Sequence, residues 1–152
     1  MPVLFDTSIY ITALRTGDGE MLQGRWLGES PVWLSSVVVE ELYAGAQASD
    51  THVLSKLERD LRGRTLTPDA GDWQRAGKVL AQVGRKYGFE HIGKARLVND
   101  ALIATSAARN GITVITANKR DFEKLAEFCP LQWQVRAATR DLPTLQIKDD
   151  TQ

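Results

Sequence analysis

Acidic side chains recur in this sequence where a short apolar run meets a helix or a turn. Asp6 and Glu41 each follow such a run, Asp100 precedes another, and Asn118 and Asp121 follow that last one. Two carboxylates about 4 Å apart repel by ~4 kcal/mol at an effective dielectric constant of ~20. A cluster of them would raise pKa values or require a cation. Oxygen ligands without His or Cys suit Mg²⁺ or Mn²⁺ and argue against zinc. Carboxylates holding Mg²⁺ are equipped for phosphodiester chemistry, because the metal lowers the pKa of bound water and neutralises charge on the phosphate.

The runs that precede these acids predict the strands of a parallel sheet. Residues 3–5, 32–34 and 113–116 are apolar or β-branched, and helical periodicity follows the first two. Leu66 and residues 133–135 predict shorter strands. Strands that alternate with helices favour a βαβ arrangement, in which ligands bind outside the carboxyl ends of the strands. We therefore expect an α/β fold with a central, mostly parallel sheet of four or five strands.

The stretch Asn99 to Phe122 carries three of the five polar candidates. We expect Asp100 at the start of an Ala-rich helix that runs to Asn110 and stops at Gly111, since Asn-Gly after a periodic run ends a helix. We expect Asn118 and Asp121 in the polar turn beyond the strand. Residues 91–96 are expected to form a basic loop.

Two further helices are predicted from spacing. In the helix after the second strand, successive residues differ in direction by about 100°. Glu41 therefore shares a face with apolar neighbours such as Val38, whereas Glu40 faces solvent. Ser35 or Ser36 is expected to cap this helix, as Thr7 or Ser8 caps the first one, and Asp69 or Asp72 a later one. That later helix ends at Gly88 and is expected to turn a periodic stripe toward the core, namely Trp73, Ala76, Leu80, Val83 and Tyr87.

Length and composition point to one cytoplasmic domain. The chain has 152 residues and no net charge, so no global field draws it to nucleic acid or lipid. The single Cys129 cannot form an internal disulfide, which fits a reducing compartment. We find neither a signal peptide nor an apolar run long enough to span a membrane. We expect residues 1–135 to form the domain and residues 136–152 to be a partly mobile tail.

Three stretches in this order resemble the motifs of the PIN-domain family, and within it the VapC-type toxins of bacterial and archaeal toxin–antitoxin pairs. LFDTSIYI is similar to the first motif, with Ser8 where the family usually has Asn. LSSVVVEELYAG is similar to the second and maps its catalytic Glu to Glu41. NDALIATSAARNGITVITANKRDF is similar to the third, with its Asp at Asp100 and its fourth acidic position at Asn118, three residues before Asp121. The resemblance spans Pro2 to about Pro130.

This resemblance implies a three-layer α/β/α PIN-like fold and a Mg²⁺-dependent endoribonuclease, with Mn²⁺ as an alternative ion. It implies hydrolysis by metal-bound water, giving a 5′-phosphate and a 3′-hydroxyl. It also implies a homodimer and a VapB-like antitoxin whose C-terminal segment covers the groove. On this interpretation Asp6, Glu41 and Asp100 hold the metal, and Asp121 or Asn118 completes its shell.

Other polar residues near the motifs are placed to assist. Thr7 or Thr116 is placed to orient water or phosphate. Single-stranded or looped RNA is the expected substrate, because a deep acidic site needs a splayed backbone. The basic residues nearest the motifs, which we expect to contact RNA phosphates, are Lys94, Arg96, Lys119 and Arg120.

Two alternatives remain at this point. Another Mg²⁺-dependent phosphohydrolase, such as a haloacid dehalogenase-type phosphatase, needs an acid two residues after its nucleophilic Asp, and Ser8 occupies that place. A receiver domain lacks its paired acids here. The second alternative is a PIN fold kept as a binding or assembly module with little nuclease activity, which the Asn at position 118 favours and the three intact carboxylates oppose.

Overall fold

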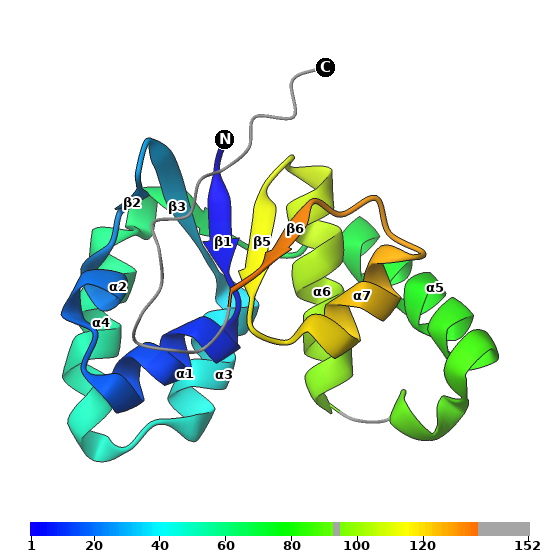
Figure 1. Ribbon diagram of the computed structural model, residues 1–152, viewed down its shortest axis with the longest axis horizontal. Coiled ribbons are helices and arrows are strands. Elements are labelled where there is room, and N and C mark those ends of the chain that lie inside the picture. The colour runs from blue at the N-terminus through cyan, green and yellow to red at the C-terminus, as the bar shows by residue number, and fades with distance from the viewer. Residues whose placement is uncertain (93–94, 137–152) are drawn as a thin grey trace.

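The structure is a computed structural model that describes residues 1–92 and 95–136 (Figure 1). Its strands are β1 (Val3–Phe5), β2 (Trp26–Leu27), β3 (Ser30–Ser35), β4 (Thr65–Leu66), β5 (Thr113–Thr116) and β6 (Trp133–Val135). Its α-helices are α1 (Thr7–Thr16), α2 (Gly19–Gln23), α3 (Ser36–Gly45), α4 (Thr51–Asp60), α5 (Ala70–Tyr87), α6 (Ala95–Arg109) and α7 (Lys119–Ala126). Short 3₁₀ helices are η1 (Ala48–Asp50), η2 (Arg62–Arg64) and η3 (Phe89–His91).

The sheet has the order β2-β3-β1-β5-β6, with β4 also paired to β3. Strands β4, β3, β1, β5 and β6 run parallel, and β2 pairs antiparallel with β3. All residues of β1 and β5 are buried, as central strands covered on both faces must be. The prediction of a three-layer α/β/α fold around a mostly parallel sheet is confirmed. The short β2, which lengthens the sheet beyond the expected strands, was not predicted.

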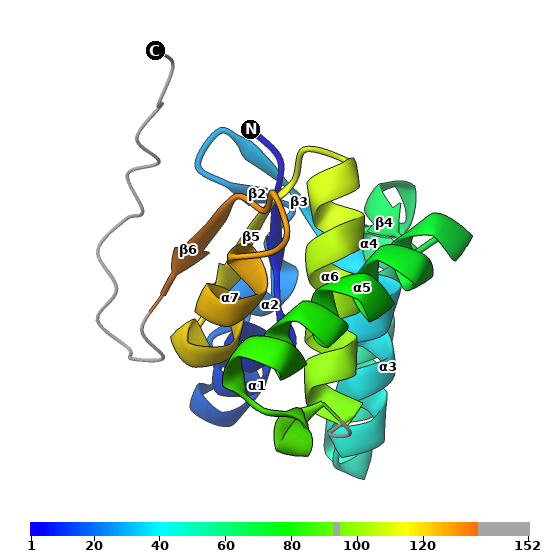
Figure 2. The ribbon, with the colours of Figure 1, turned by 90° about the vertical axis from the view of Figure 1, so that its right-hand side faces the viewer.

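Helices cover the sheet and fix the position of its carboxyl-end edge. In Figure 1 helices α1 to α4 gather beside β3, and α5 to α7 gather beside β5 and β6. Figure 2 shows α5 and α6 packed along each other and along the sheet. The carboxyl ends of β1 and β5 lie side by side, because Phe5 is in register with Ile115. The chain leaves both strands at that edge, next to the beginnings of α1 and α7.

Several local predictions need correction. Asp100 lies in the second turn of α6, because the helix already begins at Ala95. Leu97 is buried and gives this first turn an apolar anchor, so Arg96 is helical and not part of a loop. Asp6 itself caps α1, in place of Thr7 or Ser8. Of the alternatives given for the two other helices, Ser35 and Asp69 are the caps.

The apolar stripe of α5 is only partly in the core. Ala76, Leu80 and Val83 are buried, but Trp73 is 58% exposed and Tyr87 is 38% exposed. Trp73 lies in the first turn of this 18-residue helix, and Tyr87 is its last residue. The domain boundary at residue 135 remains a prediction, and the tail expected to be mobile lies, from residue 137 on, outside the described residues. Within the described part of the chain, no helix has the length and apolar character needed to cross a membrane.

Candidate functional site

Asp6 lies at the carboxyl end of β1 and is held by both of its oxygens. Its Oδ1 accepts hydrogen bonds from the backbone N–H of Ser8 at 3.0 Å and from the Ser8 hydroxyl. Its Oδ2 accepts a hydrogen bond from the Thr116 hydroxyl at 2.6 Å. Its own backbone N–H donates to Ile115 O at 3.0 Å, continuing the β1–β5 ladder. The carboxylate is therefore fixed between the first turn of α1 and the end of β5, and only 3% of the residue is exposed.

The same two hydroxyls also hold the turn that follows β5. Ser8 Oγ accepts the backbone N–H of Ala117 at 3.0 Å, and Thr116 Oγ1 accepts the backbone N–H of Asn118 at 2.9 Å. Each hydroxyl thus donates to Asp6 and accepts from the turn. Asp6 and the turn that carries Asn118 consequently form one hydrogen-bonded unit, although they are more than 100 residues apart in the sequence.

Asn118 lies between the two remaining aspartates. Its side-chain amide donates to Asp121 Oδ2 at 2.9 Å and to Asp100 Oδ2 at 3.4 Å. Its Oδ1 accepts the backbone N–H of Asp121 at 3.4 Å, so it also caps α7. The structure therefore brings Asp100, Asn118 and Asp121 together. The Asn118 amide lies between the two carboxylates, at the position where the resemblance placed a fourth acid.

Glu41 comes from α3 and contacts the residue that follows Asp6. Its Oε1 accepts a hydrogen bond from the Thr7 hydroxyl at 2.9 Å. It is half-buried whereas Glu40 is exposed, which confirms the choice between them made from helical spacing. Thr7 therefore contacts a candidate metal ligand, which is a different contact from the water or phosphate expected for it.

The electrostatics of the cluster are those of crowded acids with little counter-charge. Burial raises the pKa of Asp100 to about 8, with further contributions from the negative charges of Asp6, Glu41 and Asp121, and Arg96 opposes them only in part. Burial also raises the pKa of Asp6 despite its hydrogen bonds, and burial followed by the charge of Glu40 and Asp6 raises that of Glu41. Among the ion pairs of residues 1–92 and 95–136, none involves these acids.

The donor set fits a hard divalent cation in kind. It consists of carboxylate and amide oxygens, the ligands that Mg²⁺ takes, with neither His nor Cys beside them. As the side chains stand, no three of the described His, Cys, Asp or Glu residues are arranged to hold a metal ion. The carboxylates are near enough to raise one another's pKa values but are not closed into a coordination shell.

The basic residues expected near the site are distributed unequally. Arg96 and Arg120 line a cavity of about 380 Å³ that also reaches Asn118 and Asp121. Lys119 is exposed and lies outside this cavity, and Lys94 lies outside the described residues. Two residues that sequence reasoning missed, Tyr87 and Lys124, line the same cavity. Tyr87 was assigned to the core by its helical spacing, and no role was predicted for Lys124.

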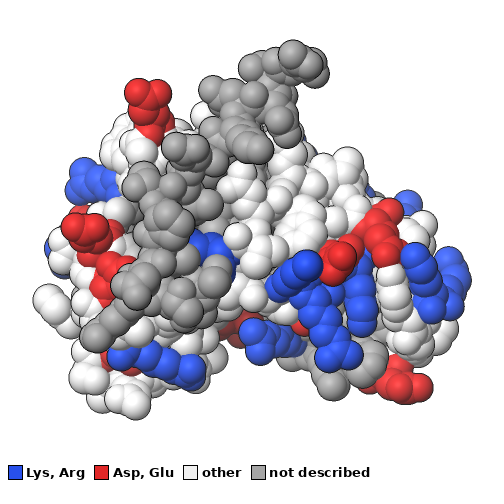
Figure 3. Space-filling view, in the orientation of Figure 1, with Lys and Arg blue, Asp and Glu red and all other residues white. Residues whose placement is uncertain are grey.

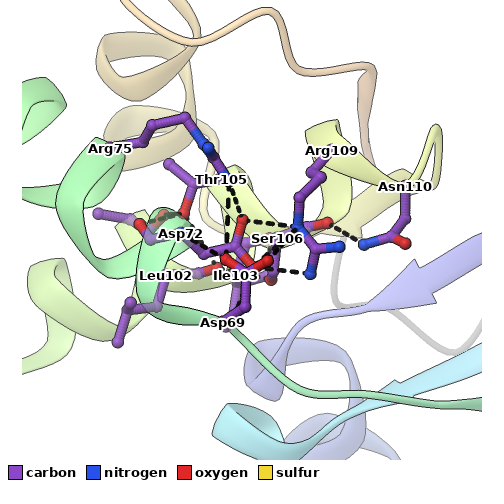
Figure 4. Close-up of polar contacts among 10 residues, drawn as sticks. Asp69, Asp72, Arg75, Leu102, Ile103, Thr105, Ser106, Arg109 and Asn110 are labelled. Atoms are coloured by element: carbon purple, nitrogen blue, oxygen red, sulfur yellow. Dashed lines mark hydrogen bonds and ion pairs between the residues drawn. The ribbon is translucent and has the colours of Figure 1, made fainter.

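A second buried acid lies away from this cluster and differs from it in charge environment. Asp72 of α5 is fully buried and accepts two hydrogen bonds from Arg109 Nε at 3.0 and 3.1 Å, one from Arg109 Nη2 at 2.8 Å and one from Arg75 Nη2 at 2.5 Å (Figure 4). It also accepts the backbone N–H of Asp69 in a capping box. Burial alone would raise the pKa of Asp72, but the arginines and this N–H lower it to about 2.

The comparisons with known proteins agree with this architecture. The PIN domain matches residues 3–128, so the chain belongs to the PIN-domain family. No curated protein matches it. Its fold is similar to a chain of DNA-bound VapBC from Salmonella typhimurium (TM-score 0.65, 22% identity, covering 89% of this chain and 98% of that one). It is also similar to a chain of VapBC-1 from nontypeable Haemophilus influenzae (TM-score 0.63, 24% identity, covering 89% of this chain and 98% of that one). A third similar chain is from VapBC2 of Rickettsia felis bound to a promoter DNA fragment (TM-score 0.62, 23% identity, covering 90% of this chain and 99% of that one).

Proposed function

We propose that this protein is the toxin of a VapBC-type toxin–antitoxin pair and acts as a divalent-metal-dependent endoribonuclease in the cytoplasm. The observation that carries the proposal is the group of acids at the carboxyl-end edge of a PIN-domain sheet, which have no counter-charge among the described ion pairs. Buried carboxylates with raised pKa values in one location mark a functional site more often than a structural one. The similarity in fold to chains from VapBC complexes supports the toxin assignment.

Each residue has a role in this proposal. Asp6, Glu41, Asp100 and Asp121 hold Mg²⁺, or Mn²⁺ in its place. Asn118 sets the orientation of Asp100 and Asp121 through its amide, at 3.4 and 2.9 Å. The Thr7 hydroxyl fixes the Glu41 carboxylate in the same way. When bound, the divalent ion would supply Lewis acidity and a water of lowered pKa.

Other residue roles in this proposal concern proton transfer and the binding of RNA phosphates. Hydrolysis that leaves a 5′-phosphate and a 3′-hydroxyl breaks the bond between phosphorus and the 3′ oxygen, which then takes up a proton. With a pKa of about 8, the Asp100 carboxyl holds a proton near neutral pH and releases it when a cation binds. Arg96, Lys119 and Arg120 contact phosphates of a single-stranded or looped RNA, and Lys94 remains a candidate for the same role.

Two kinds of protein partner belong to the proposal. A VapB-like antitoxin places its C-terminal segment over the groove, and a second copy of the chain forms a homodimer with two sites along one groove. Size-exclusion chromatography with light scattering measures the dimer directly. Expression in a bacterial cell, with and without the neighbouring open reading frame, tests the toxin role: growth arrest and new RNA 5′ ends should appear only without it. Unchanged growth in both cases, with no new ends, would remove the toxin assignment.

A PIN-fold binding module without nuclease activity is the second candidate. It is favoured by Asn118 in the fourth acidic position and by carboxylates that, among the described residues, do not form a closed shell as they stand. Cleavage of a mixed RNA pool by the wild type and by Asp100→Asn, with Mg²⁺ or with EDTA, separates the two. Cleavage by the wild type alone, dependent on Mg²⁺, supports the nuclease. No cleavage by either favours the binding module, and cleavage by both indicates a contaminating nuclease.

A further inference from the structure

The cavity beside the acidic cluster is lined by both acidic and basic residues. Two of the lining residues, Asn118 and Asp121, belong to the candidate site. Three others are cationic and come from two different helices, Arg96 of α6 and Arg120 and Lys124 of α7. Figure 3 shows Lys and Arg side chains gathered over α7 and the adjacent part of the molecule. The volume of the cavity, about 380 Å³, falls in the range of ~300–1,000 Å³ that is usual for small-ligand sites.

One of the three cavity cations, Lys124, is held by a contact between α5 and α7. The Lys124 ammonium lies 4.8 Å from the centroid of the Tyr87 ring. The Tyr87 hydroxyl donates to Glu127, which also accepts from Lys86 at 2.8 Å. This pairing neutralises Lys86, while Lys124 and Arg96 act only through space on the charges of Glu127 and Asp100. Among the ion pairs of the described residues, none involves Arg96, Arg120 or Lys124.

We propose that this cavity binds one backbone phosphate of the RNA strand, at a linkage next to the one that is cleaved. The inference rests on the proposed function and extends it, because it separates a binding subsite from the cleavage site. The cavity is continuous with the carboxylates through Asn118 and Asp121, so a strand whose cleaved linkage lies at the acids continues into it. A singly charged phosphate of a strand fits a cavity that carries both cations and the Asp121 carboxylate. A compact polyanion fits it less well, because its several charges would contact Asp121 as well as the cations.

Lys124 is the residue that distinguishes this subsite from a general basic rim. It is half-buried, it faces the cavity and its position is set by the Tyr87 ring. Exposed Lys and Arg side chains elsewhere on α5, such as Lys78 and Arg85, lie outside this cavity. The subsite therefore predicts a loss of binding at one linkage, whereas a general rim predicts a small, uniform loss for any basic residue removed.

The test compares two double variants that remove equal charge. Arg120→Ala/Lys124→Ala removes two cavity cations, and Lys78→Ala/Arg85→Ala removes one Lys and one Arg outside the cavity. Binding of a fluorescent single-stranded RNA is measured in EDTA, so that cleavage plays no part. For the cavity variant we expect the slope of log Kobs against log[salt] to become shallower by about 0.7, because the cavity holds one phosphate and each neutralised single-strand phosphate adds ~0.7 to the slope. The control variant should change the slope little, and thermal unfolding of both checks that they fold.

A scan with methylphosphonate linkages, each neutralising one phosphate, then locates the bound phosphate. Neutralising the bound linkage should weaken RNA binding to the wild type and to the control variant. It should not weaken binding to the cavity variant, because that variant has already lost the cations that contact this phosphate, and changes at two groups in contact are not additive. Equal effects of that linkage in all three proteins, or equal salt slopes for the two double variants, would overturn the subsite. So would loss of affinity for an acidic antitoxin peptide while RNA binding stays unchanged. Cleavage of the unmodified RNA with Mg²⁺ is scored separately, so a failed nuclease is distinguished from a failed subsite.

Discussion

Two buried aspartates in this molecule, Asp72 and Asp100, are exposed by only 0% and 4%, yet their pKa values move in opposite directions. The pKa of Asp72 is lowered to about 2 and that of Asp100 is raised to about 8. Both carboxylates lie on long helices that pack against each other, so helix and layer do not explain the difference. The difference lies in their neighbours: two arginines contact Asp72, whereas three other acids surround Asp100.

The contrast separates a carboxylate paired inside the protein from one that we propose to be functional. Asp72 joins α5 to α6, because Arg109 comes from the second helix and binds both of its oxygens. Every charge in that cluster is balanced within the protein. The cluster around Asp100 lacks any such balance among the described ion pairs, and its ionised form carries a cost that a bound proton or an external cation can offset. A buried acid without a cationic partner among the described ion pairs is therefore where a ligand is to be sought.

The largest effect should follow from removing the charge of Asp100. Asp100→Asn is expected to lower Mg²⁺-dependent RNA cleavage about 10³-fold, since a metal site is worth several kcal/mol in the transition state. Cleavage rates at saturating Mg²⁺ measure this, and Asp72→Asn is the matched control with the same chemical change. If the two variants lose activity equally per folded molecule, the assignment of one acid to function and the other to structure would be wrong.

The reverse holds for stability. Asp72→Asn is expected to lower the free energy of unfolding by about 3 kcal/mol, because it leaves Arg109 and Arg75 beside a neutral group. Arg109 retains 36% side-chain exposure, so solvent limits the loss. Urea denaturation in EDTA measures it, with Asp69→Asn as a control at an exposed acid of the same cluster. A change below about 0.5 kcal/mol, the size usual for surface positions, would show that the α5–α6 clamp contributes little.

A smaller effect is expected from the groups that orient Asp6. Thr116→Val removes the hydroxyl that donates to Asp6 Oδ2 and accepts from the Asn118 backbone, while it keeps the shape of the residue. Partners that orient a metal ligand usually change metal affinity by ~10–100-fold. Isothermal titration with Mg²⁺ measures this loss, and Thr116→Ser should restore most of the affinity. A purely structural role would lower stability but leave the affinity of the folded protein unchanged.

The sequence allowed the sheet to be predicted well, because central strands are short and apolar on both faces. β1 and β5 were predicted with their observed bounds, and β3 was predicted two residues too short at its start and one at its end. The position of Asp6 and Asn118 at one edge followed from parallel topology alone. Helix ends were harder to predict. The start of α6 was missed because Arg96 and Gly93 suggested a loop, whereas the buried Leu97 extends the helix.

The site's polar details could not be predicted, because they depend on contacts between distant segments. Nothing in the spacing shows that Ser8 bonds both Asp6 and the turn at Ala117, or that Asn118 lies between two carboxylates. Tyr87 was assigned to the core by its helical period, but the core ends before the end of α5. Periodicity indicates which face of a helix is apolar, and it does not show how far along the helix the neighbouring layer reaches.

The pH dependence of stability should differ between the two acids, with a slope of at most about 1.4 kcal/mol per pH unit for each proton. Asp100 has a raised pKa, so its contribution is complete below its ordinary value of 3.8 and is lost as pH rises toward about 8. Asp72 has a lowered pKa, so its contribution is present above 3.8 and is lost as pH falls toward about 2. In EDTA, stability should fall between pH 4 and pH 8, less so in Asp100→Asn, and Mg²⁺ at pH 8 should recover it. Parallel urea curves for the wild type and Asp100→Asn across that range would mean that water or a fixed cation already compensates the acids, and the contrast between the two clusters would disappear.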